Sequence, residues 1–443
     1  MNRRAFLKSL TAGAAVTAVR PRISEAALPK AKITRVRVYL PPDLNQTLNQ
    51  SNMLCTVETD IGITGVGEGG TKDLLEQCAG SLIGKNPFQA EKIWQYMYAD
   101  WFYPPGREKI HAQGALDMAL WDIKGKALKV PVHELLGGTV RNYCETYSAG
   151  VGGGGGRGGR GGQGAQGGRG PQPAAGTTAP ARGGTVAADN LQRQRDAAKA
   201  VMEAGYRAYR ISAAGGATGG TYNTHEAVRS TLRTVKAVRE GVGENGDWMI
   251  DIHQRFDYND AARCCKGMEE YEPYTVEDPV RDEHAHMYIP KLRAMTTCNL
   301  CHGEEWGQRF DFYKLVENGD IDYIRATLPN VGGITEMLKV MALCDTHAVG
   351  IIPHFTGPVA TAALVHVLST FSGAVMLEAA TAARPAPTYL PELMDFRQGK
   401  LYPNDRPGLG VTLDPAGVKQ IAEITQAGPS RVYVRPDGSL THW

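Results

Sequence analysis

The segments WMID (248–251), TVE (275–277) and CNLCHGE (298–304) decide the fold of this chain. Each is a short, mainly apolar run that ends in a carboxylate, and the three acids, Asp251, Glu277 and Glu304, recur at intervals of 26 and 27 residues. This interval fits one strand followed by one helix, and in a parallel βα barrel the carboxyl ends of the strands converge on one mouth. Because oxygen ligands suit a hard cation, the segments predict a Mg²⁺ site at that mouth.

The rest of the chain after Tyr143 follows the same alternation of short apolar runs and amphipathic stretches, which is typical of parallel βα units. A closed barrel of this kind has eight strands. Eight candidate strands lie at 144–149, 208–212, 248–253, 275–278, 300–304, 322–327, 350–354 and 375–378. We therefore predict an α/β fold with a modified TIM barrel over residues 141–400.

Residues 30–140 have a different pattern. Period-two alternation over 33–40 predicts a strand, and two further strands around 53–58 and 63–68 flank turn residues at hairpin spacing. Apolar residues at helical spacing predict a helix over 112–128. This region is expected to form a small α+β domain.

The first 29 residues have the composition of a targeting segment. Arg3-Arg4, Phe6-Leu7-Lys8 and a small apolar run up to Val19 follow the order of a twin-arginine export signal. We therefore expect a bacterial protein exported to the periplasm already folded, with no stable membrane anchor once the signal is removed, since the apolar run is too short to span a bilayer. The alternative is a disordered basic N-terminus.

Residues 150–184 consist mostly of glycine with interspersed arginine, glutamine, alanine and proline, and cannot bury a core. We interpret them as a flexible insertion that follows the first barrel strand and so reaches the active-site rim. RNA binding is the weaker reading, because aromatic residues for base stacking are missing from the run. The formal net charge of +2 also gives no reason to expect a nucleic-acid partner.

Several motifs, taken in order, resemble those of the enolase superfamily, in its mandelate racemase branch, and are most similar to the mannonate and galactonate dehydratases. The resemblance runs from Lys32 to Thr412, apart from the glycine-rich insertion. Its motifs are His111–Ala127 with Pro131 and Leu135–Gly138, then Asp251–His253, Glu277–Val280, Gly303-Glu304, Asp322–Thr327 with Gly332–Thr335, Pro353-His354 with Gly357-Pro358, and Pro407–Val411.

This resemblance implies an enzyme whose domain at 30–140 caps the barrel mouth, with a C-terminal segment, 401–443, that returns to the cap. It implies Mg²⁺-dependent dehydration of a sugar acid, an aldonate, to a 2-keto-3-deoxy acid through an enediolate formed by loss of the C2 proton. We also expect a homo-oligomer.

The resemblance assigns roles to five further residues. His253, two positions after Asp251 and so expected on the same strand face, matches the general acid that expels the 3-hydroxyl. Arg210 and Tyr222 match the paired base of mannonate dehydratases, in which the guanidinium lowers the tyrosine pKa. His354 matches a second base or a contact to the substrate carboxylate, and Glu378 matches a position that hydrogen-bonds substrate.

Two departures from the family pattern favour Tyr222, with Arg210, over His354 as the base, although the choice between Tyr222 and His354 stays open. The second strand reads Arg210-Ile211-Ser212 and lacks the lysines of racemases. The sixth strand ends in Thr327 in place of an aspartate, which removes the expected orienting partner of His354. Two alternatives stay open. One is an epimerase or cycloisomerase of the same superfamily that uses His354 and Tyr222, against which the missing lysines weigh, and the other is a weakly active ligand-binding homologue.

Overall fold

The computed structural model describes residues 28–42, 52–100, 106–149, 183–213, 217–218, 221–380, 382–428 and 432–441. The predicted export signal at 1–29 and the predicted insertion at 150–184 lie almost entirely outside these ranges. The chain divides into two units, 1–30 and 31–443, and every element below belongs to the second. In the described parts, no helix is both long and apolar enough to cross a membrane.

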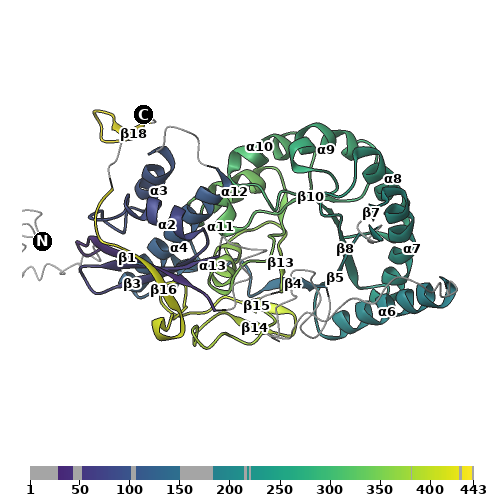
Figure 1. Cartoon of the computed structure of the whole chain (residues 1–443), viewed down its shortest axis with the longest axis horizontal. Coiled ribbons are helices and arrows are strands. Elements are labelled where there is room, and N and C mark those ends of the chain that lie inside the picture. Colours follow the sequence, from purple (N-terminus) through teal and green to yellow (C-terminus); the bar gives the residue numbers. More distant parts are fainter. Residues whose placement is uncertain are drawn as a thin grey trace, which may run out of the picture. The chain divides into compact units, whose positions relative to one another are not determined.

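The first domain is built on an antiparallel sheet. Its strands lie in the order β16-β1-β2-β3 and span Lys419–Ile424, Ile33–Leu40, Leu54–Thr59 and Thr64–Glu68. Three of them correspond to the strands predicted from alternation near residues 33, 53 and 63, and β16 comes from the C-terminal segment (Figure 1).

Helices α2 (Lys72–Ala79) and α4 (Arg107–Leu128) pack on this sheet, and α3 (Ala90–Ala99) packs on α4. Helix α4 lies against β3 at close range. A Cβ atom at Gly67 would stand 1.9 Å from the carbonyl oxygen of Ala115, so only glycine allows this approach.

The second domain is the predicted barrel. Its parallel strands are β4 (Cys144–Ser148), β5 (Ala208–Ser212), β8 (Asp247–Asp251), β9 (Thr275–Glu277), β10 (Leu300–His302), β11 (Tyr323–Ile324), β12 (Gly350–Ile351) and β13 (Met376–Glu378). They pair in the order β12-β11-β10-β9-β8-β5-β4, β13 pairs with β4, and a bridge between Ile351 and Val375 closes the ring. The α/β fold predicted from the sequence is confirmed.

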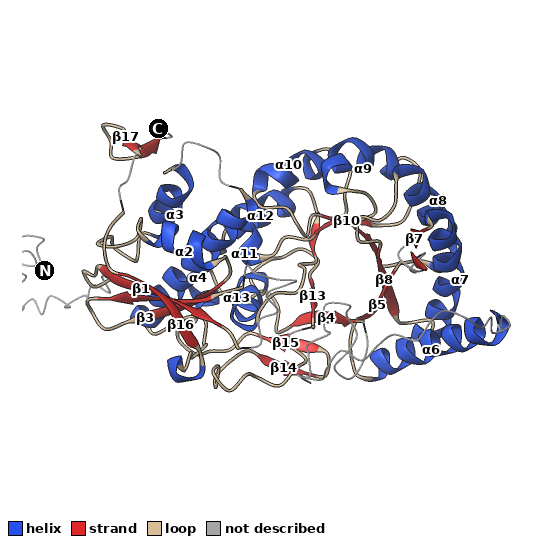
Figure 2. Cartoon of the chain, in the orientation of Figure 1, coloured by secondary structure: helices blue, strands red, loops and turns tan. Residues whose placement is uncertain are grey.

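Helices cover the outside of these strands (Figure 2). They are α5 (Val132–Leu135), α6 (Gly183–Glu203), α7 (Thr224–Val242), α8 (Tyr258–Met268), α9 (Ala285–Arg293), α10 (Arg309–Glu317), α11 (Leu328–Val331), α12 (Ile334–Thr346) and α13 (Pro358–Leu368). The short elements are β6 (Ala217–Thr218), β7 (Thr221–Tyr222), β14 (Asp395–Arg397), β15 (Lys400–Tyr402), β17 (Tyr433–Val434), β18 (Leu440–Thr441), η1 (Glu269–Tyr271), η2 (Asp282–His284) and η3 (Pro415–Gly417).

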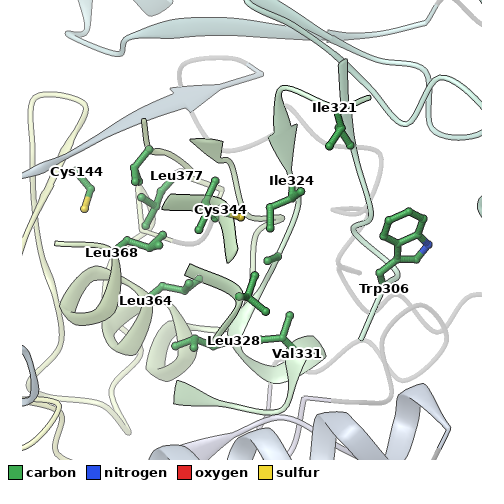
Figure 3. Close-up of a cluster of buried hydrophobic side chains, with 14 of the residues drawn as sticks. Cys144, Trp306, Ile321, Ile324, Leu328, Val331, Cys344, Leu364, Leu368 and Leu377 are labelled. Atoms are coloured by element: carbon green, nitrogen blue, oxygen red, sulfur yellow. The ribbon is translucent and has the colours of Figure 1, made fainter. Parts of the chain in front are cut away.

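The barrel has two apolar layers. A large cluster lies between strands and helices and includes Leu364 and Leu368 of α13 and Ile324 of β11 (Figure 3). A smaller cluster fills the barrel interior and consists of Tyr147, Ala208, Met249, Cys301, Ile352 and Met376. This inner cluster excludes water from the centre of the barrel, and polar groups are left to the carboxyl ends of the strands.

Candidate active site

In the barrel strands, the inward-facing side chains are apolar near the centre and charged at the mouth. Two residues after an inward-facing apolar side chain, the next inward-facing position is charged in three strands: Arg210 follows Ala208, Asp251 follows Met249, and Glu378 follows Met376. Asp251 of β8 is paired directly with Glu277 of β9. The carboxyl ends of these strands therefore form one charged ring.

Three buried carboxylates form the tightest group in this ring. One oxygen from each of Glu277, Asp278 and Glu304 lies within 4.8 Å of the other two. Glu277 and Glu304 were predicted as ligands, whereas Asp278 was not, since neighbours in a regular strand point to opposite faces. Asp278 follows the last residue of β9 and has a φ of 43°, which departs from strand geometry.

Asp251, the third predicted ligand, lies in the same ring but outside this three-oxygen group. Its Oδ2 lies 3.5 Å from Nη1 of Arg210. Its buried Oδ1, like Oδ2 of Asp278, has no hydrogen-bond partner among the described residues. Unpartnered buried carboxylate oxygens are costly unless a cation or donor meets them, so the residues present fit a hard divalent cation.

The electrostatics of the ring agree with this fit. Burial raises the pKa of Asp251 to about 6 and, together with the neighbouring carboxylates, raises that of Glu277 to about 7. Burial and the neighbouring Asp278 and Glu277 also raise the pKa of Glu304 well above its ordinary value. Carboxylates this crowded resist ionisation together, and a bound cation relieves the repulsion.

Two guanidinium groups, from the partly buried Arg210 and the fully buried Arg325, partly neutralise the ring. Arg210 contacts Glu277 at 3.3 Å and Glu378 at 3.1 Å. Arg325, which is not among the predicted site residues, lies 2.8 Å from Glu277, 3.2 Å from Glu378 and 3.5 Å from Glu304. Arg325 lies two positions after Tyr323, whose ring packs against the inner cluster, so alternation could have identified it.

Glu378, predicted to hydrogen-bond substrate, is held by protein groups on both oxygens. Its Oε1 faces Arg210, and its Oε2 accepts from the hydroxyl of Tyr147, from the Phe355 amide and from Arg325. Burial alone would raise its pKa, but the two guanidinium groups lower it to about 2. Glu378 is therefore an anion that fixes both arginines, and its contact with substrate stays a prediction.

Tyr222 does not meet Arg210 in this structure. The tyrosine lies on β7 with 37% of its surface exposed, and burial raises its pKa, while the positive charge of Arg255 acts to lower it. The guanidinium of Arg210 is occupied by the carboxylates of the ring. Arg210 is therefore not among the groups that lower the Tyr222 pKa here, because alternation turns Arg210 into the barrel and Tyr222 belongs to a separate two-stranded hairpin, and the pairing of the two as a base stays a prediction.

His253 reaches the ring by a route other than the expected strand face. Strand β8 ends at Asp251, and His253 and Gln254 have φ values of 56° and 60°. Positive φ outside glycine is uncommon and costs energy, so this turn is held by its surroundings. It places Nε2 of His253 3.5 Å from Oε1 of Glu304, while Nδ1 lies 3.0 Å from Nη2 of Arg255.

His354 lies on the other oxygen of the same carboxylate. Its Nε2 is 3.7 Å from Oε2 of Glu304. Its Nδ1 lies 2.6 Å from the carbonyl oxygen of Phe355. The imidazole of His354 therefore has an orienting partner even though Thr327 stands where an aspartate was expected. The hydroxyl of Thr327 instead donates to the carbonyl oxygen of His354. Burial lowers the pKa of His354 to about 4.

A third histidine at the mouth was missed from the sequence. His302, the last residue of β10, is fully buried, with Nδ1 3.0 Å from Asp278 and Nε2 3.0 Å from Asp282. Burial would lower its pKa, but the two carboxylates raise it to about 9. The imidazolium in turn lowers the pKa of Asp278 against the effect of burial. The sequence did hold a signal for this residue, because His302 stands only two positions before the predicted metal ligand Glu304.

Comparison with known proteins places this arrangement in a family. The chain matches the mandelate racemase / muconate lactonizing enzyme N-terminal domain over residues 32–137 and the enolase C-terminal domain-like family over residues 192–417. A D-galactonate dehydratase of Pectobacterium atrosepticum is 30% identical over 428 residues, which cover 93% of this chain and 100% of the relative.

Solved structures agree in fold. A member of the enolase superfamily from Salmonella Typhimurium has a TM-score of 0.74 at 22% identity, covering 89% of this chain and 100% of its own. A mandelate racemase/muconate lactonizing enzyme from Jannaschia sp. CCS1 has a TM-score of 0.70 at 23% identity, covering 88% of this chain and 96% of its own. The protein belongs to the enolase superfamily, in the mandelate racemase and muconate lactonizing enzyme branch.

Proposed function

We propose that this enzyme dehydrates a sugar acid, an aldonate, to a 2-keto-3-deoxy acid. The observation that carries the proposal is that two imidazoles beside Glu304 have opposite hydrogen-bond partners, a donor for His253 and an acceptor for His354. Arg255 can only donate, so Nδ1 of His253 accepts and its proton sits on Nε2. The Phe355 carbonyl can only accept, so His354 carries its proton on Nδ1 and its Nε2 is a free base.

This pairing matches the two proton transfers of a dehydration. Nε2 of His354 takes the C2 proton, and the electron pair left on carbon moves into the carboxylate to form an enediolate. Collapse of the enediolate expels the 3-hydroxyl, to which the Nε2–H of neutral His253 donates a hydrogen bond, and the departing hydroxide takes up the proton held by His354 and leaves as water. Burial and Arg255 lower the pKa of His253, which favours this neutral form. The resulting enol then tautomerises to the 2-keto acid.

Mg²⁺ would be held by Glu277, Glu304 and Asp278 or Asp251, and when bound it supplies positive charge that stabilises the enediolate.

Glu277→Gln removes one anionic oxygen and should weaken Mg²⁺ binding and turnover together. Replacing a residue that only hydrogen-bonds a metal ligand typically lowers metal affinity about 10- to 100-fold. Replacing the ligand Glu277 itself should therefore lower Mg²⁺ affinity by at least about 100-fold. Calorimetry measures it, and unchanged affinity in a folded variant removes Glu277 from the ligand set.

The similarity to a D-galactonate dehydratase supports the substrate class. The test is to incubate the purified protein with Mg²⁺ and a library of aldonates and to measure 2-keto acid formation. Racemised or epimerised acid without keto acid would favour the epimerase alternative. Saturable binding of a sugar acid with no turnover would favour a ligand-binding homologue.

The identity of the base has its own test. His354→Asn should abolish exchange of the C2 proton with deuterated solvent, whereas Tyr222→Phe should retain it, because only His354 lies at the carboxylate ring. The exposed residue His347 offers a matched control, and His347→Asn should exchange as the wild type does. If exchange survives His354→Asn and stops in Tyr222→Phe, the tyrosine is the base.

We also propose that the folded enzyme acts in the periplasm, on the basis of Arg3-Arg4 and the apolar run that follows. Replacing both arginines by lysine should keep the enzyme in the cytoplasm, which cell fractionation would measure. The expected homo-oligomer can be measured by light scattering.

A further inference from the structure

Helix α13 begins without a capping side chain of its own. It starts at Pro358, and its N-cap residue is Gly357, which has no side chain to accept from the first turn. The first regular helical bond runs from the Thr361 amide to the Gly357 carbonyl oxygen, so the amides of Val359 and Ala360 have no acceptor within the helix. Both residues are fully buried, where an unpaired amide is costly.

The missing cap comes from the other domain. Oε2 of Glu68, the last residue of β3, accepts from the amide of Val359 at 2.8 Å and from the amide of Ala360 at 3.0 Å. Glu68 is only 3% exposed. A carboxylate at this position also interacts favourably with the helix dipole, and charge-assisted bonds of this kind are stronger than neutral ones.

Gly357 is required by this arrangement. A Cβ atom there would stand 1.8 Å from Oε1 of Glu68 and 2.1 Å from its Cδ. Glycine therefore stands at the N-cap in place of the usual serine, threonine or aspartate, and it leaves space for the carboxylate of Glu68 from the capping domain.

The capped end of α13 belongs to the loop that holds His354. The loop runs from the end of β12 at Ile351 to Pro358, and its Phe355 carbonyl fixes the tautomer of His354. Contacts from the barrel hold its first half, since Arg325 donates to the carbonyl oxygens of Ile352 and Pro353, and Glu378 accepts from the Phe355 amide. Glu68 holds its second half through the helix.

We propose that Glu68 is a positioning residue through which the capping domain sets the place of His354. The kinetic part of this inference rests on the proposed function, in which His354 takes the C2 proton. The structural part does not, because it concerns the amides of Val359 and Ala360 and the distance from His354 to Glu304.

The test compares Glu68→Ala, Glu68→Gln and Trp94→Phe with the wild type. Trp94→Phe is the matched control, because the Trp94 indole donates to the Gly332 carbonyl oxygen and so also joins the capping domain to the barrel, away from His354. Hydrogen exchange of the Val359 and Ala360 amides should accelerate in Glu68→Ala, less in Glu68→Gln, and not in Trp94→Phe. The amide of Leu364, within the helix, should stay as slow as in the wild type in all three.

A crystal structure of Glu68→Ala should show Nε2 of His354 displaced from the 3.7 Å that separates it from Glu304. Displacements of about 1 Å can cost about 100-fold in rate, so kcat should fall about 10- to 100-fold. KM should change little, and Glu68→Gln, which keeps an acceptor oxygen, should recover most of the loss. Should Glu68→Ala fail to fold, Glu68→Gln carries the exchange measurement.

Unchanged exchange of both amides together with an unmoved His354 would overturn the proposal, whatever the activity. A fall in kcat that Trp94→Phe reproduces would also overturn it, since it would reflect general loosening of the two domains. If the wild type dehydrates no sugar acid, the proposed function fails, and the exchange and crystal measurements still decide the role of Glu68.

Discussion

His302, at the barrel mouth, and His366, on α13 beside the capping domain, are both fully buried, but their pKa values move in opposite directions. His302 lies between Asp278 and Asp282 and its pKa rises to about 9. The pKa of His366 falls to about 4 because of burial and the neighbouring His133. Burial disfavours charge at both positions, so the partners decide which histidine is an imidazolium at neutral pH.

The neutral pair has a defined tautomer. Nε2 of His366 faces the Leu409 carbonyl oxygen, which can only accept, so His366 carries its proton there. Its Nδ1 then accepts from Nδ1 of His133, 2.9 Å away. A second proton on His366 would point at the N–H of His133, so protonation of His366 is expected to break this contact between α5 and α13.

The largest expected effect comes from removing the charge at the barrel mouth. His302→Gln leaves Asp278 and Asp282 buried without the imidazolium between them, and breaking a buried ion pair costs about 3 to 5 kcal/mol of unfolding free energy. Denaturant titration measures it. The double variant His302→Gln/Asp282→Asn, with one carboxylate neutralised, should recover part of the loss. A single variant as stable as the wild type would mean that His302 is not charged.

The next effect concerns pH and the neutral pair. The folded pKa of His366, about 4, lies below the unfolded value near 6.5, so the unfolded chain binds the proton first as pH falls. Stability from this group is therefore present above pH 6.5 and is lost between pH 6.5 and 4, by about 3 kcal/mol at most. His366→Gln, which can still donate to Leu409 and accept from His133, should lose less over that range. Equal slopes of unfolding free energy against pH would contradict the assignment.

The smallest effect concerns the partly exposed Arg107, which pairs with Asp282. Arg107, at the start of α4, lies 2.9 Å from Asp282, but 48% of its side chain is exposed. Solvent screens such pairs, and they contribute about 0.2 to 1 kcal/mol. Arg107→Ala should therefore lower the unfolding free energy by less than about 1 kcal/mol in the same titration. A loss as large as that of His302→Gln would show that Asp282 depends on Arg107.

Some residues of the candidate site could be predicted from the sequence pattern, and others are defined only by their partners in the folded structure. Asp251, Glu277 and Glu304 were predicted because each follows an apolar run at strand-plus-helix spacing, and the carboxyl ends of parallel barrel strands converge on one mouth. Asp278 was missed because it joins the cluster through a turn with positive φ. Local periodicity carries no information about such a turn.

The arginines illustrate the same limit. Arg210 was expected to pair with Tyr222, twelve residues away, but in the barrel its partners are Asp251, Glu277 and Glu378, which lie 41 to 168 residues away. Arg325 was overlooked although it contacts three carboxylates of the ring. Ring closure sets these distances, and no local pattern encodes them.

By itself, the sequence determined the strands, the barrel, the α+β domain and most of the metal carboxylates, because periodicity and strand length are properties of neighbouring residues. The tertiary structure alone decided the charge state of each histidine, the partners of Arg210 and the capping of α13 by Glu68. These depend on groups brought together from distant parts of the chain, in a buried medium where a single partner outweighs the intrinsic preference of a side chain.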